Sequence, residues 1–171
     1  MKAYKIFVSM VACLILFQCG YHLRGTGSSL PSHITKVYIP MFKNQTTRFE
    51  LDRKLTQSVI DEFISRGKVE IVGDQESADA VLLVDILAFQ VAPIAMSNQA
   101  TADRFSITVT AKIVLRDLRQ NKVLFSNPYF PYQDDYQVSE GSDFESVETE
   151  AIDEIAEKFA RSIILSILEG F

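Results

Sequence analysis

Arg104-Phe-Ser-Ile-Thr-Val-Thr-Ala-Lys-Ile-Val-Leu-Arg116 alternates between apolar and polar side chains along almost its whole length. Successive side chains of a β-strand point to opposite faces of a sheet, so this pattern predicts a strand with one buried and one polar face. Only Val114 breaks the polar side. Arg119-Gln-Asn121 then predicts a tight turn into a second strand over 122–126, so we expect an antiparallel hairpin. The apolar side consists of Phe105, Ile107, Val109, Ala111, Ile113 and Leu115.

The sequence before this hairpin predicts a strand, a helix and two further strands. Residues 35–40 alternate as a strand does, and Thr47-Arg-Phe-Glu50 matches a capping box that would open a helix ending at Gly67. A short strand is expected over 68–72. A longer strand over 80–89 is apolar on nearly every residue, so it is either a central strand buried on both faces or one covered by a partner or by acyl chains. The buried side of the helix is expected to contain Leu51, Leu55, Val59 and Phe63.

The sequence after the hairpin predicts an irregular, tyrosine-rich stretch and a long final helix. Ser142-Asp-Phe-Glu145 matches a second capping box. The apolar stripe of this helix would contain Phe144, Val147, Ile152, Ile155, Phe159, Ile163 and Ile167. Together these elements predict an α+β fold, a two-layer sandwich in which two helices lie on one face of a mixed, mostly antiparallel sheet of four to five strands.

The N-terminus has the layout of a secretory signal. Lys2 and Lys5 precede an apolar run over 6–17, after which polar and glycine residues take over. This run is shorter than the roughly 20 residues that a helix needs to cross a bilayer. A cleaved signal is therefore preferred to a permanent membrane span.

Cys19 is the expected site of lipidation. An apolar run that ends at a cysteine followed by Gly20 resembles a bacterial lipoprotein signal, whose cysteine receives a diacylglycerol and an acyl chain. Leu16 suits such a signal, whereas Gln18 departs from the small residue usually found before the cysteine. Two alternatives stay open, namely lipidation at Cys13 and cleavage by ordinary signal peptidase, which would release a soluble periplasmic protein.

Charge and motif content argue against nucleic-acid binding and catalysis. The net charge of −5 becomes −7 when Lys2 and Lys5 are removed, so we expect no nucleic-acid partner. Calcium-loop, phosphate-loop, zinc-cluster and nucleophile-elbow patterns are missing from the sequence. Two of the carboxylates clustered over 134–157 could in principle serve glycoside hydrolysis, but helix-capping and solvated roles explain most of them. We therefore expect neither an enzyme, nor a metal site, nor a cofactor beyond the lipid on Cys19.

Cys19-Gly-Tyr-His-Leu-Arg-Gly25 closely resembles the mature start of the LptE family of lipopolysaccharide-assembly lipoproteins, and the pattern of elements is similar over essentially the whole mature chain. The resemblance implies a signal peptide (1–18), a lipidated N-terminus and linker (19–34) and an LptE-like α+β domain (35–171). It also implies an outer-membrane protein, lipid-anchored on the periplasmic side, that assembles with the LptD barrel and helps to deliver lipopolysaccharide to the outer leaflet. A free periplasmic binding or structural protein without a barrel partner is the alternative.

Two sets of residues are candidate contacts. The polar side of the alternating strand is net basic, which fits contact with lipopolysaccharide, although an ordinary solvated sheet face would look the same. The tyrosine-rich stretch interleaves aromatic rings with prolines, and such rings are enriched at protein interfaces, although they could instead cover the sheet edge. The lipopolysaccharide candidates are Arg104, Lys112 and Arg116, and the partner candidates are Tyr129, Phe130, Tyr132 and Tyr136.

Overall fold

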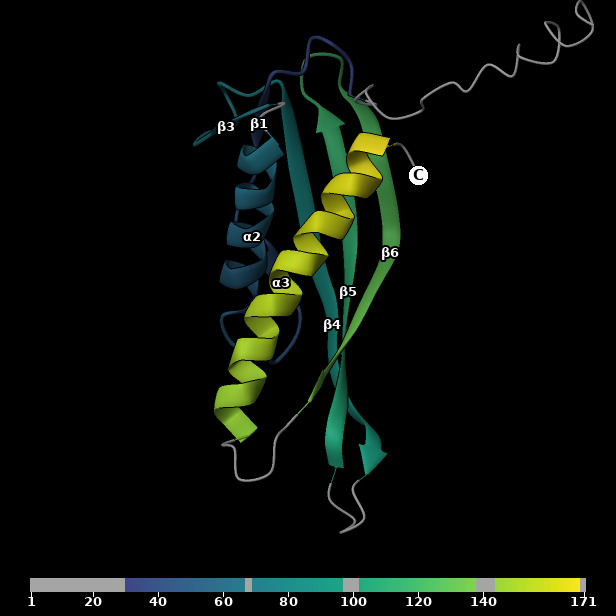
Figure 1. Ribbon diagram of the computed structural model, residues 1–171. Helices are drawn as coiled ribbons and strands as arrows, with labels where there is room; N and C mark the ends of the chain where they lie inside the picture. Colours follow the sequence, from purple (N-terminus) through teal and green to yellow (C-terminus); the bar gives the residue numbers. More distant parts are fainter. Residues whose placement is uncertain (1–29, 67–68, 97–101, 138–143, 170–171) are drawn as a thin grey trace, which may run out of the picture.

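The computed structural model describes residues 30–66, 69–96, 102–137 and 144–169. This part of the chain forms two layers, a sheet and two helices that both lie on one of its faces (Figure 1), which confirms the predicted fold class. The elements in chain order are β1 (Lys36–Tyr38), β2 (Lys43–Asn44), α2 (Leu51–Arg66), β3 (Glu70–Val72), β4 (Ala80–Met96), β5 (Ala102–Asp117), β6 (Lys122–Gln137) and α3 (Phe144–Glu169).

The sheet is mixed, as its connections require. The order is β3-β1-β4-β5-β6, and β2 also pairs with β4. The β3–β1, β1–β4 and β2–β4 pairs are parallel, and α2 provides the long crossover that parallel strands need. Short connections make the β4–β5 and β5–β6 pairs antiparallel. β4 is therefore a central strand.

The three long strands have unequal regularity. β5 keeps its alternation from Arg104 to Asp117, and its apolar side from Ile107 to Leu115 is at most 1% exposed. β4 and β6 each bulge where they contain a residue more than β5, for example at Leu87 in β4 and at the Pro128–Tyr129 step in β6. The irregular stretch expected after residue 126 was therefore a wrong prediction, because this segment continues β6 through a bulge.

The core lies between the inner face of the sheet and the two helices. The predicted helical positions from Leu51 to Phe63 are all at most 1% exposed. On α3 the predicted stripe from Ile152 to Ile167 is likewise buried, whereas the burial of Phe144 and Val147 is outside the described residues. Phe159 is the central residue of this layer, with its ring edge-on to those of Phe130 at 6.0 Å and Tyr132 at 6.2 Å.

The capping box predicted at Thr47 does not open the first helix. α2 begins at Leu51, and Glu50 has a φ of 58°, outside the helical region. The reason is a competing turn, in which the Asn44 side chain accepts the Thr46 N–H at 2.9 Å and donates to the Arg48 carbonyl at 2.8 Å. Local bonds of this kind replace the first helical turn. The second capping box, at Ser142, lies outside the described residues, and α3 begins at Phe144.

Candidate binding face of the sheet

The face of the sheet opposite the helices is the largest candidate contact surface. β4, β5 and β6 place alternate side chains there in cross-strand rows, so that Asp85 lies opposite Lys112 and Leu83 opposite Val114. Leu83 is 42% exposed although its neighbours on the inner side are buried. The apolar strand of the sequence is therefore a central strand that is only partly covered on its second side.

The three basic residues predicted to contact lipopolysaccharide all lie on this face, but they do not converge. At about 3.4 Å per residue, Lys112 is roughly 14 Å from Arg116 and about 27 Å from Arg104. Each has a polar neighbour: Arg104 pairs with Asp135 at 3.2 Å, Lys112 with Asp85 at 3.9 Å, and Arg116 donates to Asn121 at 3.2 Å. The charges of Arg104 and Lys112 are thus partly balanced before any ligand binds, whereas Arg116 donates to a neutral amide.

The aromatic residues predicted to contact a partner divide into two groups. Phe130 and Tyr136 are each only 9% exposed, and Tyr136 stacks on Phe105 with 5.5 Å between ring centroids. Tyr132 is half-buried against α3. Tyr129 is 65% exposed because it lies in the β6 bulge, where its N–H donates to the Asn127 side chain at 3.0 Å. Tyr129 is the member of the set with the greatest access to a partner.

A polar cluster that the sequence did not signal lies where the N-terminal segment joins the sheet. Asp79 is 2% exposed and accepts the backbone N–H groups of Thr35 and Lys36, each at 2.9 Å. Arg119 donates to its other oxygen at 2.5 Å. The Thr35 hydrogen bond is the main reason why the pKa of Asp79 lies well below its usual range, although burial opposes the shift. The cluster ties the segment nearest the expected anchor to the end of the sheet.

Asp117 completes this cluster from the end of β5. It is fully buried and accepts the Nε2 proton of His33 at 2.7 Å, together with the N–H groups of Arg119 and Gln120 at 2.8 and 2.9 Å. Burial raises the pKa of Asp117, but these hydrogen bonds outweigh it, so the pKa lies below its ordinary value. Both aspartates border apolar strands in the sequence, which is the one signal that marks them.

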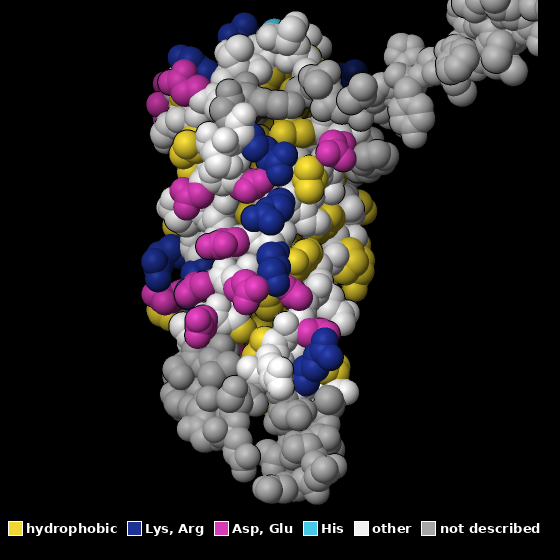
Figure 2. All heavy atoms as spheres, viewed as in Figure 1, with side chains coloured by type: hydrophobic (Ala, Val, Ile, Leu, Met, Phe, Trp, Pro, Cys, Tyr) yellow, Lys and Arg dark blue, Asp and Glu magenta, His cyan; other side chains and the backbone are white. Residues whose placement is uncertain are grey.

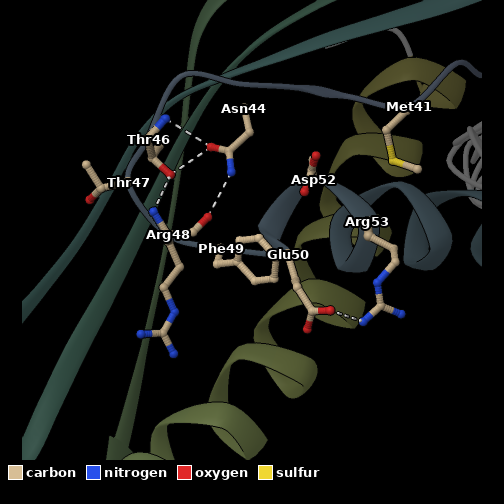
Figure 3. A pocket seen from close by; sticks show the side chains of 9 residues that line it. All are labelled: Met41, Asn44, Thr46, Thr47, Arg48, Phe49, Glu50, Asp52 and Arg53. Carbon is tan, nitrogen blue, oxygen red and sulfur yellow. Dashed lines mark hydrogen bonds and ion pairs between the residues drawn. The ribbon is translucent and has the colours of Figure 1, made fainter.

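A second surface feature lies in the loop between β2 and α2. It is a hollow of about 440 Å³ next to the Asn44 turn (Figure 3). Phe49 is 87% exposed beside it, and Met41 is 58% exposed. Arg53 pairs with Glu50 at 3.0 Å, so the charges here largely cancel. No sequence pattern indicated this hollow, because its residues matched a capping box. The lining consists of Met41, Asn44, Thr46, Thr47, Arg48, Phe49, Glu50, Asp52 and Arg53.

The clustered carboxylates take part in ion pairs. Lys158 donates to Asp134 at 2.6 Å and to Glu154 at 2.8 Å, and Lys54 pairs with Asp153. Burial raises the pKa of Asp134, but the hydrogen bond from Lys158, the Asp135 backbone N–H and the Lys158 charge together outweigh it and leave the pKa below its ordinary value. A general acid needs the opposite shift. Acidic and basic side chains also alternate over the visible helix side of the molecule (Figure 2).

Within the described ranges, no three histidine, cysteine or acidic side chains are grouped closely enough to hold a metal ion. No helix in the described part of the chain has the length and apolarity needed to span a bilayer. Cys19 and the signal segment lie outside the described residues.

Solved structures share this fold at low sequence identity. The uncharacterized lipoprotein B of Nitrosomonas europaea has a TM-score of 0.55 and 17% identity, with 87% of this chain and 90% of that chain covered. A hypothetical protein of Chlamydia trachomatis has a TM-score of 0.55 and 12% identity, with coverage of 81% and 97%. A protein of Xanthomonas campestris has a TM-score of 0.56 and 11% identity, with coverage of 80% and 85%. No sequence among the curated proteins matches the chain significantly.

The domain thus has one face of its sheet under two helices and the other face open, with its charged groups spread out in pairs. The chain belongs to the LptE family of lipopolysaccharide-assembly proteins, whose model matches residues 34–167. Members are non-enzymatic bacterial envelope lipoproteins with no known cofactor. The match confirms the family that the sequence resembles, although Cys19–Gly25 lies outside the matched residues, and it confirms the expectation that the protein is not an enzyme.

Proposed function

We propose that this protein is anchored to the outer membrane by acyl chains on Cys19, with its domain on the periplasmic side. There it assembles with the LptD barrel and assists delivery of lipopolysaccharide to the outer leaflet. The observation that carries the proposal is the family match, which extends from just before β1 almost to the end of α3. The lipobox-like end of the signal at Cys19 supports the anchor.

The two faces of the sheet suit two different roles, one in packing the core and one in contacts with other molecules. Packing against α2 and α3 holds the inner face of the sheet rigid, which leaves the outer face and the sheet edge for contacts. Lys112 and Arg116 offer two cations on the outer side of β5, with Val114 between them, and Tyr129 offers an exposed ring on the edge strand. Cations suit glycolipid phosphates, and a rigid aromatic ring suits a protein partner.

The anchor and the barrel partner are tested together in the protein's own host. The tagged full-length chain and its Cys19→Ser variant are extracted with detergent, purified by the tag and analysed by mass spectrometry. We expect the native chain to carry acyl chains on Cys19 and to recover a large outer-membrane barrel. An unmodified sulfur and no recovered barrel would instead support a free periplasmic binding or structural protein.

The basic face is tested by lipopolysaccharide binding in vitro. Lys112→Gln/Arg116→Gln should weaken binding roughly three- to tenfold, as expected for two partly exposed charge contacts. The control is Arg53→Gln/Arg161→Gln, which removes two exposed cations from the helices. Equal affinities of the two double variants would show that net charge, and not this face, governs binding.

A further inference from the structure

Half of the helix-free sheet face, the part toward the β4–β5 loop end, carries polar side chains of little net charge. The strand registers place its residues in three neighbouring rows across β4, β5 and β6. Small residues alternate with amides there, so the rows form a flat surface, which we name the platform. Its rows are Ala88–Thr110–Pro131, Gln90–Thr108–Gln133 and Ala92–Ser106–Asp135.

The platform contains an unpartnered buried hydroxyl. Ser106 is only 5% exposed, and among the described residues its Oγ has no hydrogen-bond partner. Arg104 and Asp135 pair with each other at 3.2 Å on the same face, next to this hydroxyl. A buried polar group without a partner is destabilising, and native proteins contain few of them. The Ser106 hydroxyl therefore lies just beneath the surface of the platform with its hydrogen-bonding capacity unused by the described residues.

The chemistry of the platform selects a neutral, hydroxyl-rich ligand. Gln90 and Gln133 are both exposed, and each amide can donate and accept hydrogen bonds as sugar hydroxyls do. The Arg104 guanidinium and the Asp135 carboxylate balance each other, so a phosphate gains little net attraction here. Between these groups, Pro131 and two alanines offer apolar surface for the C–H side of a sugar ring.

We propose that the platform binds neutral sugar residues, and that their source is the saccharide part of lipopolysaccharide. The choice of lipopolysaccharide as the sugar-bearing molecule rests on the proposed function. The argument that the platform binds neutral sugars rests on the side chains of the platform alone. Sugar contacts on the platform and cation contacts at Lys112 and Arg116 would then lie along one strand of one face. An extended glycolipid headgroup can span both.

The amides are tested with the mature full-length chain and three probes: whole lipopolysaccharide, its delipidated core oligosaccharide, and a free neutral glucan. Gln90→Ala/Gln133→Ala should weaken core-oligosaccharide binding roughly tenfold or more, because two neutral hydrogen bonds are lost. The matched control, Gln57→Ala/Gln75→Ala, removes two exposed glutamines from other surfaces and should leave binding unchanged. Equal binding of both double variants would overturn the proposal.

Ser106→Ala separates a ligand contact from a structural role. Because the hydroxyl has no partner among the described residues, its removal should leave the thermal midpoint unchanged or raise it. Core-oligosaccharide binding should nevertheless weaken about fivefold, the effect of one hydrogen bond. A lower midpoint with unchanged binding would show that Ser106 serves the fold, and would overturn its place in the site.

The remaining outcomes distinguish failure of the platform proposal from failure of the proposed function. If lipopolysaccharide binds while the core oligosaccharide neither binds nor competes, the platform proposal fails and the proposed function stands. If neither binds, the proposed function fails as well. Preference for the free glucan would overturn lipopolysaccharide as the source. If the Gln90/Gln133 variant binds sugars normally but loses the barrel in pull-downs, the face is a protein interface and the saccharide proposal is overturned.

Discussion

Replacement of Asp79 by alanine should detach the N-terminal segment from the end of the sheet. The Asp79 carboxylate accepts the backbone N–H groups of Thr35 and Lys36 and the Thr35 hydroxyl, each at 2.9 Å. Alanine leaves these donors without an acceptor, directly before and at the start of β1. The expected result is a domain that folds with a weakened connection between its N-terminal segment and β4.

The magnitude follows from the two backbone donors. A buried donor left unpaired costs about 1–3 kcal/mol. Thr35 is exposed, so water can replace the acceptor that its N–H loses, whereas Lys36 is less exposed and its N–H loses more. Arg119 is 62% exposed, so its ion pair with Asp79 adds less than about 1 kcal/mol. We expect Asp79→Ala to lower the free energy of unfolding by about 2–4 kcal/mol, with a smaller loss for Asp79→Asn, which keeps an acceptor oxygen.

Urea unfolding followed by circular dichroism measures this loss. With a slope of about 2 kcal/mol per molar urea, the midpoint should fall by roughly 1–2 M. The matched control is Asp74→Ala, because Asp74 also accepts a backbone N–H, from Ser77 at 2.8 Å, but at an exposed site. If the Asp79 and Asp74 variants lost the same small amount, the argument from buried donors would be refuted.

The same carboxylate predicts a pH dependence with a definite sign. The pKa of folded Asp79 lies well below its ordinary value, chiefly because of the Thr35 hydrogen bond. A depressed folded pKa gives stability that is fully present above the unfolded pKa of about 4 and is lost as pH falls through the folded value. The stability difference between wild type and Asp79→Asn should therefore be constant from pH 7 to 5 and shrink below pH 4. A difference that grew in acid would contradict this assignment.

Three further substitutions probe the core, a buried hydrogen bond and the sheet edge. Phe159→Ala should lower the free energy of unfolding by about 3–5 kcal/mol because the ring is fully buried, and a loss below about 1 kcal/mol in urea unfolding would argue against its central position. Thr56→Val deprives the Phe42 N–H of its 3.0 Å acceptor and should cost about 1–3 kcal/mol, whereas Thr56→Ser, which keeps the hydroxyl, should unfold close to wild type. Tyr129→Ala should leave the thermal midpoint unchanged but reduce barrel recovery in the native pull-down, and undiminished recovery would remove Tyr129 from the partner contacts.

The regularity of each strand explains whether that strand could be predicted from the alternation of its side chains. β5 pairs on both sides without an extra residue of its own from Arg104 to Asp117, so its side chains keep a period of two. β4 and β6 contain the extra residues, and each bulge shifts the alternation by one position. Pro128 and Tyr129 therefore had the sequence pattern of a loop although they lie within a strand.

The candidate contacts were likewise predictable on the regular strand β5 and not on the bulged strand β6. The polar side of β5 was predictable, and Arg104, Lys112 and Arg116 do share one face. The burial of Phe130 and Tyr136 was not, because their inward orientation depends on the register of β6 against β5 after the bulge. Neither was the Ser106 site, which exists only where three strands bring their rows together.

Local periodicity and turn chemistry were enough to predict both helices, the main strands and the lipoprotein-like start, because these depend on neighbours a few residues apart. They did not predict the start of α2 or the continuation of β6 beyond residue 126. The Asp79 and Asp117 cluster required contacts across 44 and 84 residues of chain, to Thr35 and His33. The platform likewise required the register of three strands. Contacts between distant segments depend on how the whole chain packs, and no short stretch of sequence contains that information.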